Sequence, residues 1–240
     1  MLQMNYFKTS LLSLLLLAGC AAEAPPTRPV AALDTGASWY QKAAQAGKKV
    51  YKIDAQQSLI TITVRRGGAL ARLGHDHVVA SRSLEGFVAP DAGRADFHFR
   101  LDQLTVDEPS LRLAAGLDTQ PSNDAIAGTR ANMLNRVLEA ERYPVVMLHA
   151  ERAGSAAGGA GGAGVAGVHL LRLTVTLHGV ARSFDVPTTI ERQKNALTAS
   201  GELRMLQSAF GITPMSVMGG AMTVQDQMEL KFRIVAKSGK

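Results

Sequence analysis

The chain has 240 residues, a formal net charge of +6 at pH 7 and one cysteine. A single cysteine excludes a disulfide within the chain and a zinc site built from several thiolates. The basic residues are scattered and no aromatic side chains alternate with them, which argues against a nucleic-acid partner.

Residues 1–19 are typical of a bacterial export signal. Lys8 supplies positive charge, and the leucine-rich run at residues 11–17 has the length of a signal-peptide core. A membrane-spanning helix needs about 20 apolar residues, so this run is too short to cross a bilayer. We therefore expect residues 1–19 to be removed from the mature protein.

The signal ends in the sequence LAGC at residues 17–20, which resembles the bacterial lipobox. The resemblance implies that Cys20 becomes a lipid-anchored N-terminus, and two or more acyl chains make such an anchor stable. Because Ala21 rather than an aspartate follows, the sorting rule of such lipoproteins predicts the periplasmic face of the outer membrane. The inner membrane, and an ordinary secretory signal with a chance cysteine, are the alternatives.

Residues 20–49 are expected to form a tether and a short helix. The stretch at 21–37 is rich in Ala, Pro, Thr and Gly, a composition typical of a linker. Ser38 is positioned to cap a helix that carries Trp39 and Tyr40 and ends at Gly47.

From residue 50 onward the apolar period is two, as in antiparallel strands with one buried face. Alternating segments begin at residues 60, 95, 171, 184 and 228, and Pro187 is expected at a strand edge. Further strands are expected at residues 84–88, 145–151 and 197–206. Eight or more such strands favour an all-β barrel or sandwich over a parallel sheet.

One short helix interrupts the β pattern. We expect Thr129 to cap it and Pro144 to stop its continuation, and its apolar face is formed by Met133, Leu134, Val137 and Leu138. In an all-β chain such a helix is expected to cover a barrel end. Residues 153–167 are almost entirely Gly and Ala, so they predict a loop between two strands.

Residues 50–240 are expected to form one domain. About residues 50–237 of this domain resemble the YceI-like family. The motifs that carry the resemblance are YKID at residues 51–54, LTVTLHGV at 173–180 and SAFGI at 208–212. The resemblance implies an antiparallel eight-stranded lipocalin-like barrel with a short covering helix. It also implies a long internal cavity that binds a polyisoprenoid or similar lipid, without catalysis.

The alternating apolar positions are the candidate ligand-binding residues of that cavity. A long tail has a large driving force for burial, because each methylene moved out of water contributes about 0.8 kcal/mol. The period alone does not distinguish a ligand tunnel from a filled core, so a structural envelope protein stays open. The candidates are Ile60, Ile62, Phe97, Phe99, Leu173, Val175, Met205, Phe210 and Phe232.

The sequence GHDH at residues 74–77 stands where the first hairpin should turn. If the ligand is a quinone or an isoprenyl phosphate, its polar head could meet His75 or His77, together with Arg72 or Arg82. The alternative is a metal or cofactor site on His75 and His77, since residues two apart on a strand share one face.

Enzyme signatures are weak, and we expect no catalytic residue. No G-x-S-x-G elbow, H-E-x-x-H pair or phosphate loop occurs. The expected partners are an amphiphilic lipid, isoprenoid-like or quinone-like, and the membrane that holds the anchor. No other cofactor is expected, and a homodimer stays open.

Overall fold

The structure, a computed structural model, describes residues 35–117, 119–153 and 167–238. The predicted signal peptide, Cys20, the first part of the predicted tether and most of the predicted Gly/Ala loop lie outside these residues. Among the described residues, no helix is long and apolar enough to cross a membrane.

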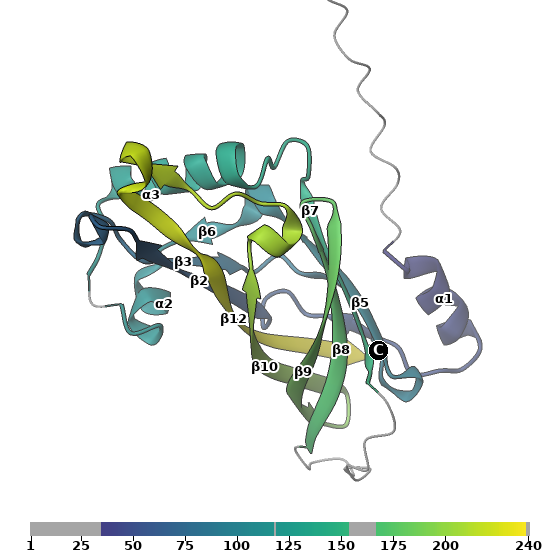
Figure 1. The fold of residues 1–240 in the computed structure, drawn as a ribbon. Helices are drawn as coiled ribbons and strands as arrows, with labels where there is room; N and C mark the ends of the chain where they lie inside the picture. Colours follow the sequence, from purple (N-terminus) through teal and green to yellow (C-terminus); the bar gives the residue numbers. More distant parts are fainter. Residues whose placement is uncertain (1–34, 118, 154–166, 239–240) are drawn as a thin grey trace, which may run out of the picture. The chain divides into compact units, whose positions relative to one another are not determined.

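Eight strand positions close into one antiparallel ring (Figure 1). β12 pairs with β10 on one side and returns to β1 on the other, where Ser238 lies opposite Tyr51. The predicted eight-stranded lipocalin-like barrel is therefore confirmed. Its strands in ring order are β1 (Tyr51–Ile53), β4 (Glu85–Ala89), β5 (Arg94–Arg100), β7 (Val145–Arg152), β8 (Gly167–Leu177), β9 (Val180–Arg192), β10 (Ala196–Leu206) and β12 (Met222–Ser238).

Two positions of the ring each hold two strands. β1 and β2 (Leu59–Gly67) both pair with β12, and β4 and β3 (His77–Ser81) pair with β1 and β2, respectively. The first part of β12 pairs with β2, and β2 continues the ladder beyond β1. β3 carries β6 (Thr105–Val106) on its far side. The short β11 (Ser216–Val217) pairs with the start of β12.

The wall between β9 and β10 opens at one end. Their ladder covers only Thr188–Arg192, so Pro187 lies inside β9 rather than at the strand edge expected from the sequence. A proline fits there because it has no N–H to donate at the point where the ladder ends. Phe210 contacts this region: it is fully buried, and its ring lies 6.4 Å from that of Phe184 on β9.

The predicted covering helix exists, but it begins earlier than expected. α3 spans Asn123–Asn132 and continues into a π-helical turn, η4 (Met133–Val137). Ser122, not Thr129, is its N-cap, and the Ser122 hydroxyl accepts a hydrogen bond from the Ala125 amide at 3.2 Å. Arg130 attaches α3 to the barrel by donating to the carbonyl oxygens of Leu104 and Asp102.

The remaining helices are short. α2 (Pro109–Ala114) follows β6 and has no counterpart in the sequence prediction. Single 3-10 turns link other elements, namely η1 (Ala71–Leu73), η2 (Pro90–Ala92), η3 (Leu101–Gln103), η5 (Ser208–Phe210) and η6 (Met218–Gly220).

α1 (Ala37–Gln45) packs on β4. Its N-cap is Gly36 with a positive φ of 66°, so Ser38 lies inside the helix instead of capping it. Tyr40 is buried, and its ring stacks on Phe87 with centroids 5.4 Å apart. The helix thus covers apolar surface that β4 would otherwise expose.

Asp96 on β5 is the polar centre of this contact. Its carboxylate accepts hydrogen bonds from the Tyr40 hydroxyl at 2.8 Å, Arg94 Nε at 2.6 Å and His149 Nδ1 at 2.6 Å. Burial opposes ionisation of Asp96, but these hydrogen bonds outweigh it and hold the pKa below its ordinary value. Burial, followed by the bond to Asp96, raises the pKa of Tyr40.

Candidate functional site

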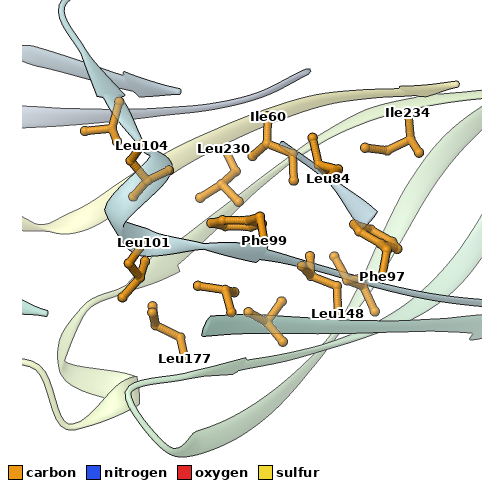
Figure 2. Close-up of a cluster of buried hydrophobic side chains, with 14 of the residues drawn as sticks. Ile60, Leu84, Phe97, Phe99, Leu101, Leu104, Leu148, Leu177, Leu230 and Ile234 are labelled. Atoms are coloured by element: carbon orange, nitrogen blue, oxygen red, sulfur yellow. The ribbon is translucent and has the colours of Figure 1, made fainter. Parts of the chain in front are cut away.

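Two cavities lie end to end inside the barrel. Cavity 1 has a volume of about 110 Å³ and cavity 2 a volume of about 240 Å³. Ile60, Leu148 and Leu230 line both cavities, and we call these three side chains the waist. Figure 2 shows them inside the barrel together with Phe97 and Phe99.

Apolar side chains dominate both linings because each strand turns every second residue inward. Along β5, for example, Phe97 lines cavity 1 and Phe99 lines cavity 2. Of the candidate residues from the sequence, Ile60, Phe97, Leu173 and Phe232 line cavity 1. Ile60, Ile62, Phe99, Val175 and Met205 line cavity 2. That they bind a ligand stays a prediction.

Phe210 is the exception, because it lines neither cavity. It lies on η5, which contacts both β9 and β10 near the end of their ladder. Its ring is fully buried in the apolar core near Phe184, and its part in ligand binding stays a prediction. A residue in a turn has no strand alternation from which its direction could have been inferred.

Cavity 2 ends beneath α3. Met133, Val137 and Leu138 line it from the helical segment, and His77 lines it from the start of β3. His77 Nδ1 lies 2.5 Å from Asp107 Oδ2, so the carboxylate directs which ring nitrogen carries the proton. No hydrogen bond to Nε2 occurs among the described residues, which leaves this nitrogen for a ligand.

Asp107 is held in turn by a buried arginine. Arg112 Nη1 donates to Asp107 Oδ1 at 2.6 Å and to the carbonyl oxygen of Asp76 at 2.7 Å, and Arg112 also donates to the Thr119 carbonyl. Both charged side chains are almost completely inaccessible. Burial raises the pKa of Asp107, but hydrogen bonds from His77, the Val78 amide and Arg112 bring it below its ordinary value.

The other predicted headgroup residues do not reach a cavity. Arg72 and His75 are exposed, and Arg82 is paired with Glu108 at 2.9 Å. None of these three residues lines either cavity, so their part in ligand binding stays a prediction, whereas His77 lines cavity 2. The hairpin is interrupted by η1 and a loop, so His75 is not on a strand and does not share a strand face with His77.

The metal alternative has no support from neighbouring ligands. The rings of His75 and His77 are 6.3 Å apart, and one nitrogen of His77 is already bonded to Asp107. Within residues 35–117, 119–153 and 167–238, no group of three or more His, Cys, Asp or Glu side chains could hold a metal ion.

The far end of cavity 1 is basic, which sequence reasoning missed. Arg152, His169 and Arg192 line it there, and we call these three side chains the basic mouth. Arg152 and Arg192 occupy the last inward-facing positions of β7 and β9, and His169 lies two residues from the start of β8 on its inward face. The alternation could have found them, had it been extended to the strand ends.

Comparison with known proteins assigns this barrel to a family. No curated protein matched the chain. The family model described as the YceI-like domain matches residues 51–236. The chain belongs to the YceI-like family. That match starts at β1 and ends within β12, so the family's domain coincides with the closed ring.

Solved structures resemble this chain at low sequence identity. One is described as a polyisoprenoid binding domain from Saccharophagus degradans implicated in plant cell wall breakdown. It is 14% identical with a TM-score of 0.57, over 79% of this chain and 98% of that one. BcnA of Burkholderia cenocepacia is 16% identical with a TM-score of 0.49, over 77% of this chain and 99% of that one.

Proposed function

We propose that this YceI-like protein holds an isoprenoid or similar amphiphilic lipid in its barrel. The observation that carries the proposal is the pair of apolar cavities that meet at the waist. A lipid tail in these cavities would leave water along its whole length, and each buried methylene contributes about 0.8 kcal/mol before ordering costs. The Saccharophagus degradans domain with the same fold is described as polyisoprenoid-binding.

Bound lipid is tested directly on the purified full chain. Organic-solvent extraction followed by mass spectrometry should recover about one amphiphile per chain, and native mass spectrometry should show the same added mass. Those spectra also report the oligomeric state. If no lipid is recovered and added geranylgeraniol does not bind, the proposal fails.

A pair of substitutions separates the cavity from the outer surface. Ala199 lines cavity 1, so Ala199→Phe should occupy ligand space and reduce lipid binding. Ala181→Phe adds the same ring at an exposed position on β9 and should leave binding unchanged. Equal lipid binding by the two variants, both shown to be folded by thermal melting, would contradict a ligand in cavity 1.

We also propose that the protein binds its ligand without transforming it. Thr129 and Thr188 supply the hydroxyl groups of the two linings, and no Ser or Cys lines either cavity in the described part of the chain. Thr188 Oγ1 already donates to the Val186 carbonyl. Geranylgeraniol incubated with the protein should therefore be recovered unchanged, and a time-dependent product would contradict this.

A lipid anchor on Cys20 and a location at the periplasmic face of the outer membrane complete the proposal. Its support is the sequence LAGC at residues 17–20, followed by Ala21. Labelling with an alkyne fatty acid should mark the wild type but not Cys20→Ser, and membrane fractionation should place the labelled protein with outer-membrane markers. Label in the variant, or sedimentation with the inner membrane, would overturn the respective part.

A further inference from the structure

The two ends of the barrel interior differ in charge. Arg94, Arg152, Arg192 and His169 line cavity 1, and no Asp or Glu lines it among the described residues. At the other end, His77 is the one ionisable side chain that lines cavity 2 within those residues. His77 is bonded to Asp107, and the positive charge of Arg112 balances the negative charge of Asp107. The charged groups at that end are therefore already paired with one another.

Arg94 contributes little free charge to the mouth. Its Nε lies 2.6 Å from Asp96 Oδ2, and its guanidinium stacks on Trp39 at 4.8 Å from the ring centroid. Arg94 therefore helps to hold α1 against the barrel. The charge of the basic mouth must come from other residues.

Arg152 and Arg192 have no such partners among the described residues. Neither guanidinium forms an ion pair or a side-chain hydrogen bond with another described residue, whereas Arg94 is paired with Asp96. Arg152 is exposed, whereas Arg192 and His169 are half-buried. Half-buried charge next to apolar side chains interacts with an anion more strongly than charge in bulk water.

The barrel register places these groups around the same opening. Arg152 lies opposite Leu171 on β8, so His169 is its diagonal neighbour two residues along. Arg192 lies opposite Leu197, where β9 turns into β10 at that end of the barrel. Three consecutive strands therefore direct basic side chains toward the entrance of one apolar cavity.

We infer that the basic mouth binds the anionic head of the lipid, a phosphate, diphosphate or carboxylate group, while the tail runs past the waist into cavity 2. The inference rests on the proposed function and adds the head chemistry and the orientation of the ligand. Guanidinium groups bind phosphate and carboxylate oxygens through charge-assisted hydrogen bonds, which are about twice as strong as neutral ones. A neutral head would leave the positive charges of the two arginines without a counter-charge.

The test compares two lipids that share one tail. Native mass spectrometry or calorimetry on the full chain measures the dissociation constants of geranylgeranyl monophosphate, geranylgeraniol and inorganic phosphate. We expect the lipid phosphate to bind at least about tenfold more tightly than the alcohol, and inorganic phosphate to bind more weakly than either.

Matched double variants assign the difference to the basic mouth. Arg152→Gln/Arg192→Gln should reduce this preference for the phosphate to near unity. Arg182→Gln/Arg204→Gln removes the same charge from exposed positions and should keep the preference. Thermal melts of both double variants establish that they are folded.

Each other outcome has a definite meaning. Equal affinity of the wild type for the two lipids, or a preference that survives in Arg152→Gln/Arg192→Gln, overturns the inference but leaves the proposed lipid binding intact. Inorganic phosphate that binds as tightly as the lipid phosphate identifies a free-phosphate site and also overturns it. Failure of both lipids to bind is failure of the proposed function itself.

Discussion

His77 Nδ1 lies 2.5 Å from Asp107 Oδ2, and this contact joins the inner end of cavity 2 to the buried guanidinium of Arg112. Asp107 has a positive φ of 57°, an uncommon conformation for a residue other than glycine. The bonds to His77, Val78 and Arg112 hold it there. A polar network thus orients His77 in the lining of cavity 2.

Removing the carboxylate should be costly, because it leaves Arg112 buried without its counter-charge. We expect Asp107→Ala to lower the free energy of unfolding by about 3–5 kcal/mol, measured by urea denaturation. Asp185→Ala is the control, since Asp185 pairs with Arg172 at an exposed site and its loss should change stability very little. Similar losses in the two variants would contradict a structural role for the buried pair.

Acid should release α1 through Asp96. The pKa of Asp96 in the folded protein lies below its ordinary value of 3.8, so its stabilisation is complete above that value. This contribution is lost as pH falls through the lower, folded pKa. Trp39, the sole tryptophan, stacks on Arg94 and reports the change by its fluorescence.

The control for this titration is Asp96→Asn. We expect this variant to show altered Trp39 emission already at neutral pH and to lose the acid transition. An unchanged acid transition in the variant would assign it to another group.

The waist should control the length of tail that the barrel accepts. Leu148→Ala joins the two cavities more widely, so we expect affinity for longer isoprenoid alcohols to rise relative to shorter ones. Stability should fall by about 2–5 kcal/mol. Leu84→Ala removes another buried leucine, one that lines neither cavity, and should destabilise without changing tail preference. A parallel change in both variants would show that the waist is not selective.

Gly86 should tolerate no side chain. A Cβ at this position would lie 2.2 Å from the carbonyl oxygen of Asp96 and 2.5 Å from the Phe97 Cα on the paired strand β5. We expect Gly86→Ala to lower the melting temperature strongly, because these are backbone atoms. Gly128 lies on α3, and a Cβ there would meet no atom within 4 Å outside its own helix backbone. Gly128→Ala should therefore raise the free energy of unfolding by about 0.5–1 kcal/mol. Equal melting temperatures would contradict the close strand approach.

Several features were predictable because they depend on local periodicity. The alternation after Ile60, Ala95 and Leu171 identified the inner faces of β2, β5 and β8. The start of α3 was not predictable in this way. The polar residues of its first turns gave no apolar stripe, so the cap was predicted at Thr129 instead of Ser122.

The candidate site depended on contacts between distant residues. Asp107 is 30 residues from His77 in the chain, and no local pattern indicates that the two side chains meet. The basic mouth combines the ends of β7, β8 and β9, whose arginines look like ordinary surface charge when each strand is considered alone. Arg72, His75 and Arg82 were favoured because they are near one another in the sequence.

The sequence by itself determined that the chain forms antiparallel strands with one apolar face, that a short helix accompanies them, and that the motifs are those of a YceI-like barrel. A period of two follows from backbone geometry and needs no partner. Only the tertiary structure decided that β12 returns to β1, that the waist divides the interior, and that one entrance is basic. Those features arise from register and ring closure, which depend on strands far apart in the sequence.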